Sequence, residues 1–169
     1  QICRCGCSHP MGAHPLVTLT LHINGAKHQV TSDPDMPLVF VLRDELKLKG
    51  TKLGCALEQC GACAVLVDGK VVLSCVTALD AFVGKEITTI EGIEASEIGR
   101  RVQDAFVAES AAQCGYCTAG LVVAATGLLN ENPSPDRAAT ISALMPHLCR
   151  CGSHPRVLKA VERAAAKMK

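Results

Sequence analysis

Hydrophobic and polar residues alternate strictly along residues 16–23, where Val, Leu and Ile side chains occupy every second position from Val17. A period of two residues is typical of a β-strand with one buried face. Asn24-Gly25 follows this strand, and the dipeptide is a strong signal for a two-residue hairpin turn. Residues 26–31 are therefore predicted to pair back on the first strand.

The pattern changes to a helical period after Pro37, which suits the first position of a helix because it has no N–H to satisfy. Apolar residues then recur at intervals of three and four, which is the spacing of one helix face. The predicted inner face consists of Leu38, Val41, Leu42 and Leu46. Gly50 is predicted to end this helix.

A second hairpin is predicted within residues 64–74, with its turn at Asp68-Gly69. A last short strand is expected near residues 87–90. Two hairpins that enclose one helix predict a small α+β domain of the β-grasp type over residues 16–90.

From Ser96 onward the apolar residues follow a helical period. The first predicted helix begins at Ser96, and its apolar stripe consists of Ile98, Val102, Ala105 and Phe106. A second helix is predicted over residues 117–130, which are apolar almost throughout.

Two further helices are predicted toward the end of the chain. Ser134 and Pro135 suit the N-cap and the first position of a helix that ends at about Leu144. The last helix is predicted to begin near Pro155, capped by His154, with an inner face of Val157, Leu158, Val161 and Ala165. The four helices predict an all-α bundle domain over residues 96–169.

The net charge and hydrophobic content of the chain limit the functional classes to which it can belong. The chain has 169 residues with a net charge of +1, which gives no basis for binding nucleic acid or a membrane surface. No apolar run reaches the roughly 18–20 residues of a membrane span, and the first fifteen residues lack an apolar signal core. Hydrophobic residues make up 49% of the chain, so we expect part of the surface to be buried against another subunit.

Eleven cysteines dominate the chemistry of the chain, and eight of them form two sets of four. The first set reads C-x4-C-x2-C and adds a fourth cysteine after eleven residues; it consists of Cys55, Cys60, Cys63 and Cys75. This is the spacing of the ligands of a plant-type [2Fe–2S] ferredoxin. A structural zinc site is the alternative, but zinc sites typically use two paired C-x2-C knuckles.

The second set reads C-x2-C and, 31 residues later, C-x-C; it consists of Cys114, Cys117, Cys149 and Cys151. These cysteines fall at predicted helix ends, where helix N-termini favour an anionic cluster. Arg150 adds a positive charge between two of them. From spacing alone a zinc site remains open for this set. Such close spacings and an odd total are poor disulfide patterns and indicate metal ligation in a reducing compartment.

Several stretches of the chain resemble a known family. They are Gly54-Cys55, Gln59-Cys60-Gly61-Ala62-Cys63, Gln113-Cys114-Gly115-Tyr116-Cys117, Cys149-Arg150-Cys151-Gly152, Leu42-Arg43-Asp44-Glu45-Leu46, Asp68-Gly69 and Thr88-Thr89-Ile90-Glu91-Gly92. Together they resemble the small iron–sulfur subunit of the xanthine oxidase (molybdenum hydroxylase) family over about residues 16–165. The resemblance implies a plant-type ferredoxin-like domain followed by a helical bundle domain, each with one [2Fe–2S] cluster on its four cysteines.

The resemblance also implies partners and a role. A large subunit would bind a molybdopterin-type cofactor, which Gln113 and Cys151 of this chain would contact. That subunit would hydroxylate an aldehyde or an N-heteroaromatic ring. Electrons would leave it through the two clusters to a flavin subunit or a cytochrome c-type acceptor, whose cofactor would be FAD or haem. A free-standing two-cluster electron carrier and a zinc-stabilised interaction module are the rival interpretations. The expected location is the cytoplasm, or the periplasm if a leader has been removed.

Two features depart from the family pattern or lie outside it. Many relatives have Gly where this chain has Ala56 and Glu58, and Pro where it has Ala119; we expect Glu58 to face solvent or a partner. Residues 1–15 are predicted to be a peripheral extension. Its cysteines, Cys3, Cys5 and Cys7, nearly repeat the pattern of residues 148–155, and are interpreted as free thiols or, with His9 or His14, as a third metal site.

Overall fold

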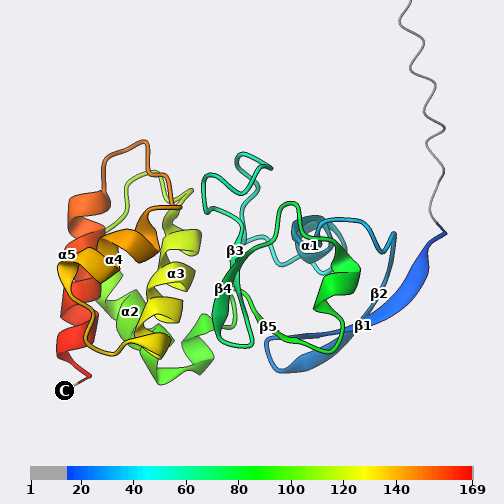
Figure 1. Ribbon diagram of the computed structural model, residues 1–169, viewed down its shortest axis with the longest axis horizontal. Helices are drawn as coiled ribbons and strands as arrows, with labels where there is room; N and C mark the ends of the chain where they lie inside the picture. The colour runs from blue at the N-terminus through cyan, green and yellow to red at the C-terminus, as the bar shows by residue number, and fades with distance from the viewer. Residues whose placement is uncertain (1–14, 169) are drawn as a thin grey trace, which may run out of the picture.

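The computed structural model describes residues 15–168. The cysteines and histidines of the predicted extension, up to His14, lie outside these residues. Two structural units lie side by side in Figure 1, a β-sheet with its covering helix and a bundle of helices. None of the helices in the described part of the chain is long and apolar enough to cross a bilayer.

The sheet has five strands in the order β2-β1-β5-β3-β4. Its strands are β1 (Val17–Ile23), β2 (Ala26–Ser32), β3 (Ala64–Val67), β4 (Lys70–Leu73) and β5 (Glu86–Thr88). β1 and β5 pair in parallel, and the other neighbours are antiparallel. Both predicted hairpins are confirmed, with left-handed backbone at Asn24-Gly25 and at Asp68-Gly69, as tight hairpin turns of this kind require.

One short helix covers the sheet. It begins as α1 (Leu38–Phe40) and continues as the π-helical turn η1 (Val41–Glu45). Leu38, Val41 and Leu42 are buried against the sheet, as predicted. The prediction that Gly50 ends the helix is wrong, because Lys47 already adopts left-handed backbone with φ 59°. A 3₁₀ turn, η2 (Leu79–Phe82), completes this side of the domain.

The helical unit begins with the 3₁₀ turn η3 (Ile93–Ala95) and contains α2 (Glu97–Ala108), α3 (Thr118–Glu131), α4 (Arg137–Leu144) and α5 (His154–Ala166). Ser96 caps α2 by accepting from the N–H of Gly99 at 2.9 Å. The cap of α4 is Asp136, which accepts from Ala139 N–H at 2.7 Å, so the prediction of Ser134 is wrong. Asp136 is the better cap because its carboxylate is a charged acceptor at a helix N-terminus.

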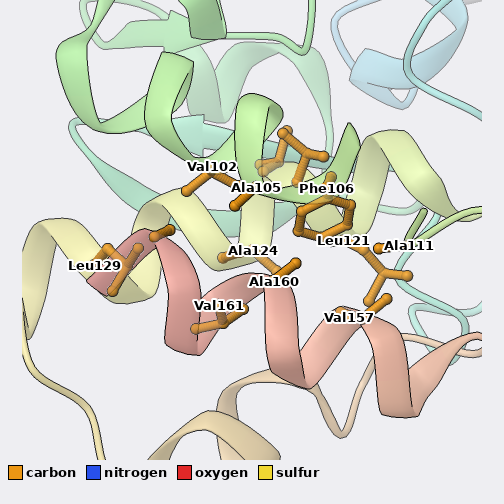
Figure 2. Close-up of a cluster of buried hydrophobic side chains, with 14 of the residues drawn as sticks. Val102, Ala105, Phe106, Ala111, Leu121, Ala124, Leu129, Val157, Ala160 and Val161 are labelled. Carbon is orange, nitrogen blue, oxygen red and sulfur yellow. The ribbon is translucent and has the colours of Figure 1, made fainter. Parts of the chain in front are cut away.

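One hydrophobic cluster, centred on α3, is common to both units, and a separate cluster lies between the sheet and its covering helix. Figure 2 shows side chains of α2, α3 and α5 converging, with Phe106, Leu121 and Val157 among them. Ala64 and Leu66 of β3 belong to the same cluster, because α3 also packs against the sheet. This explains why α3 is apolar on nearly every side. The predicted fold class, α+β with a β-grasp domain before a helical bundle, is confirmed.

Candidate metal centres

The first set of cysteines lies at the edge of the sheet nearest the bundle. Cys55, Cys60 and Cys63 belong to the segment between η1 and β3, which we call the first cysteine loop (residues 54–63), and Cys75 follows β4. Cys55 is in hydrogen-bonding contact with Cys60, and Cys63 with Cys75. The fold therefore brings together the four residues that the spacing grouped.

Backbone N–H groups of the first cysteine loop point at sulfur atoms. Leu57 and Gln59 donate to Cys55 Sγ at 3.4 and 3.2 Å, and Glu58 donates to Cys75 Sγ at 3.4 Å. Such concave rows of N–H groups are sites for anions. Four thiols with N–H groups directed at them are the donor set that an anionic [2Fe–2S] cluster requires, so the residues present fit this group.

The same N–H groups change the acidity of the thiols. Burial acts to raise the pKa of the Cys55 thiol, but the N–H groups of Leu57 and Gln59 outweigh it and lower the pKa to about 7. Burial and the neighbouring Cys75 thiol raise the pKa of Cys63 to about 12. The buried Cys63 thiol therefore resists ionisation, whereas the Cys55 thiol, in the loop that faces solvent, ionises more readily.

Residues with left-handed backbone conformation give the first cysteine loop its shape. Ala56, Glu58 and Gly61 have φ values of 54°, 56° and 69°. L-residues with a Cβ adopt this region only at a cost, which explains why Gly is common there in relatives. Glu58 is exposed, as expected, and its carboxylate accepts a 3.4 Å hydrogen bond from Thr77 Oγ1. The carboxylate is therefore held at the surface beside Thr77.

The second set lies where helices of the bundle begin. Cys117 is the N-cap residue of α3, and Cys151 lies three residues before α5. The thiols are in contact pairwise, Cys114 with Cys151 and Cys117 with Cys149. Helix N-termini carry a partial positive charge, which favours an anionic cluster bound at these positions.

The environment of the second set also gives its thiols different pKa values and different exposure. Burial and the nearby Cys149 raise the pKa of Cys117 to about 11. Burial acts to raise the pKa of Cys149 too, but hydrogen bonds from Ser153, whose Oγ lies 2.9 Å from Cys149 Sγ, lower it to about 6. Cys114 and Cys151 are exposed. One side of the set is therefore open at the surface.

Both sets line one cavity of about 360 Å³. Its walls include six of the eight cysteines, namely Cys55, Cys60, Cys114, Cys117, Cys149 and Cys151. Within residues 15–168, no three or more His, Cys, Asp or Glu side chains are grouped as ligands of one metal ion.

Three contacts join the first cysteine loop to the second set. The N–H of Leu148 donates to Cys60 O at 3.0 Å. The hydroxyl of Tyr116 donates to Leu53 O at 2.6 Å. Gly120 of α3 approaches so closely that a Cβ there would lie 2.2 Å from Gly61 O. The two sets are thus held against each other by contacts between the sheet unit and the bundle.

His147 flanks the C-x-C motif, where a structural role is expected from the sequence, and the structure buries it beside the first cysteine loop. Its side chain is 3% exposed and packs against Gly61, and its Nδ1 has no hydrogen-bond partner among the described residues. Burial lowers the pKa of His147 to about 4, so the ring is neutral at pH 7. His154 does not cap α5 as predicted; its Nε2 lies 2.9 Å from the carbonyl oxygen of His147 instead. No sequence signal separates these two histidines, because only packing buries one of them.

Gln113 and Cys151 line a second cavity of about 340 Å³ on the surface of the bundle. Gln113 lies in the connection between α2 and α3, and Cys151 in the connection between α4 and α5. Both residues are exposed. The fold therefore brings together the two residues predicted to contact a cofactor of a partner, at a surface that a partner can reach.

Comparison with known proteins agrees with this geometry. Residues 21–86 match the family model of the 2Fe-2S iron-sulfur cluster binding domain, and residues 89–162 match that of the [2Fe-2S] binding domain. One subunit of the nicotinate dehydrogenase of Pseudomonas putida KT2440 is 45% identical over 88% of this chain and 94% of its own length. The chain belongs to the small iron–sulfur subunits of the molybdenum hydroxylase (xanthine oxidase) family.

Other members of this family are similarly close. The alpha subunit of isoquinoline 1-oxidoreductase of Brevundimonas diminuta is 42% identical over 85% of this chain and 94% of its own length. Among solved structures, quinoline 2-oxidoreductase from Pseudomonas putida 86 contains a chain that superposes with a TM-score of 0.84 at 36% identity, covering 90% of this chain and 95% of that one. The likeness to the small iron–sulfur subunits therefore extends over both units of the fold.

Proposed function

We propose that this chain is the electron-transfer subunit of a molybdenum-containing hydroxylase or dehydrogenase complex. The observation that carries the proposal is the shared cavity, in which cysteines of both sets face each other. Cys55, Cys60, Cys63 and Cys75 would hold one [2Fe–2S] cluster, and Cys114, Cys117, Cys149 and Cys151 the other. Bound there, the clusters would accept and release single electrons.

The residues of the chain would adapt each set to an anionic centre. In the first set, the N–H groups of Leu57, Glu58 and Gln59 offset negative charge on sulfur. In the second set, the partial positive charge at the N-termini of α3 and α5 offsets negative charge on sulfur. The buried side of the first set, at Cys63 and Cys75, excludes water, and the exposed loop at Leu57 presents that set to a flavin subunit or a cytochrome-type acceptor.

The second set would face the molybdenum-binding large subunit. Gln113 and Cys151 line the same surface cavity and would contact the pterin of the partner's cofactor. Large apolar side chains are exposed nearby, with Met145 77% and Leu148 62% accessible. Exposed apolar side chains that gather in this way mark surfaces that a partner covers. The aldehyde or N-heteroaromatic substrate would react on that partner. The cysteine spacing, which suits metal ligation better than disulfides, supports a reducing compartment such as the cytoplasm.

Metal analysis and EPR spectroscopy of protein purified from its native source test this proposal. We expect two iron pairs per chain, two distinct [2Fe–2S] signals after reduction, and co-purification with a molybdenum-containing subunit. Zinc in place of iron, or a single centre, would contradict the ligand assignment. A monomer that remains soluble and fully reducible without companions would instead support a free-standing electron carrier.

A further inference from the structure

Tyr116 lies between two predicted ligands of the second set, yet its hydroxyl reaches the first. Its Oη donates to the carbonyl oxygen of Leu53 at 2.6 Å, and Leu53 precedes Cys55 by two residues. We propose that Tyr116 is a positioning residue for the first cluster. Its hydroxyl would hold the start of the first cysteine loop, and with it Cys55, at the cavity shared with the second set. The inference rests on the ligand assignment proposed above.

The first cysteine loop is tied to the bundle on two sides. Tyr116 holds the chain at Leu53, just before Cys55, and the N–H of Leu148 holds it at Cys60 O at 3.0 Å. Between these points the N–H groups of the loop donate to its own cysteines and to Cys75. Loss of the tyrosine hydroxyl therefore releases the Cys55 side of the loop and leaves the Cys60 side attached.

Neighbouring bonds confine this effect to the start of the loop. Arg43 Nη1 donates to Thr51 O at 2.7 Å, and Lys52 N–H donates to Ala62 O at 3.0 Å. These bonds hold the residues that precede Leu53 whether or not the hydroxyl is present. Replacing Tyr116 with Phe removes the hydrogen bond to Leu53 O and retains the half-exposed aromatic ring. The Tyr116→Phe variant therefore separates positioning from packing.

The test compares Tyr116→Phe with the wild type in the intact, iron-loaded chain. EPR-monitored titration gives the midpoint potential of each centre, and a ferrous chelator gives the rate at which each signal is lost. We expect the first-set signal to shift in potential and to disappear about fivefold faster, because a lost hydrogen bond makes opening of the loop about that much more frequent. The second-set signal should keep its potential and its rate of loss.

Thr18→Val is the matched control. Thr18 also makes one side-chain hydrogen bond, with 3.2 Å between its Oγ1 and Thr31 Oγ1, but it lies on β1 and outside the cavity that the two sets line. This variant should leave the first-set rate and potential as in the wild type.

Two results would overturn the inference alone, provided that the wild type shows both signals. One is a Tyr116→Phe variant with unchanged first-set rate and potential. The other is equal acceleration at both centres, which would indicate general destabilisation. A wild type with fewer than two [2Fe–2S] signals would overturn the proposed function and this inference together.

Discussion

The amide of Leu148 and the carbonyl oxygen of Cys60 form a 3.0 Å hydrogen bond that joins the two cysteine sets through the backbone. Leu148 immediately precedes Cys149, a predicted ligand of the second set, and Cys60 is a predicted ligand of the first. A few covalent bonds and one hydrogen bond thus separate the two sets. The geometry makes each set sensitive to changes in the other, although sequence patterns assign them to different domains.

Replacing Cys60 with serine should remove one centre and spare the other. Ser is a weaker iron ligand than a thiolate, and the first set has four predicted ligands in all. We expect the first-set EPR signal to disappear, the second-set signal to remain, and the iron content to fall by about half, as the loss of one of two equal clusters requires. Cys114→Ser should give the complementary result. Retention of both signals in Cys60→Ser would contradict the assignment of this ligand.

Gln113→Ala should leave both clusters in place and weaken the complex. Gln113 is exposed, lines the surface cavity with Cys151, and is not among the predicted ligands. We expect normal iron content and EPR signals together with lower affinity for the large subunit or its cofactor, measured by co-purification yield and titration calorimetry. Gln103→Ala, on α2 and away from this cavity, serves as the control. Unchanged affinity and turnover in Gln113→Ala would refute its role.

Gly61→Ala should be strongly destabilising. A Cβ at this position would lie 2.2 Å from Nδ1 of His147, and the backbone has φ 69°. Strain of about 1–2 kcal/mol is expected from the backbone alone, and overpacking adds about 1–3 kcal/mol. Urea unfolding measures the sum.

Gly84→Ala separates the two contributions, because φ there is 77° and no atom lies within 4 Å of the added Cβ. The free energy of unfolding of this variant should fall only by the amount of the backbone strain. Equal losses in Gly61→Ala and Gly84→Ala would show that His147 moves away freely and does not hold the loop.

Glu58→Gly should stabilise the protein. Glu58 has φ 56° and is exposed, with one 3.4 Å hydrogen bond from Thr77. Relief of left-handed strain, about 1–2 kcal/mol, exceeds the entropic cost of glycine, about 0.5–1 kcal/mol. The free energy of unfolding should therefore rise by about 0.75 kcal/mol, the difference between the midpoints of these two ranges.

The neighbouring Leu57→Gly variant is the control, because Leu57 is exposed but is not among the residues with positive φ. Here glycine relieves no strain, and the unfolding free energy should fall. If both substitutions destabilised the protein to the same extent, strain at Glu58 would not be a factor.

Stability should fall as the pH drops from about 6.5 to about 4 because of His147. Burial lowers the pKa of His147 from 6.5 to about 4 in the folded chain, so the unfolded chain binds a proton more readily within this window. Stability linked to His147 is therefore fully present above the unfolded pKa and is lost as the pH falls toward the folded one. A difference of this size corresponds to about 3 kcal/mol.

Urea unfolding at pH 7 and pH 5 of the apo chain, compared with His147→Asn, measures this contribution. The variant should lose part of the pH dependence, since Asn does not titrate. An identical slope in both proteins would mean that His147 is already accessible to water in the folded state.

Sequence patterns determined most of the elements and the grouping of the cysteines. The period of two along residues 16–23, the turn dipeptide Asn24-Gly25 and the helical period that starts near Ser96 act through neighbouring residues, so local chain geometry is enough to predict them. The spacing of the cysteines likewise reflects a local requirement, because a compact loop must present several thiolates at once. The ligand assignment itself stays a prediction until metal is measured.

Only the tertiary structure decided how these parts meet. Helix α3 packs on β3, and this contact places Tyr116 beside Leu53, Leu148 beside Cys60, and His147 against Gly61. Each of these pairs is far apart in the chain, and no residue spacing encodes its distance. The sequence alone thus predicted which residues carry the chemistry, whereas the packing of one apolar helix between sheet and bundle determined that both cysteine sets line a single cavity. Burial of apolar surface is non-directional, so a sequence pattern can indicate that a face is buried but not which partner covers it.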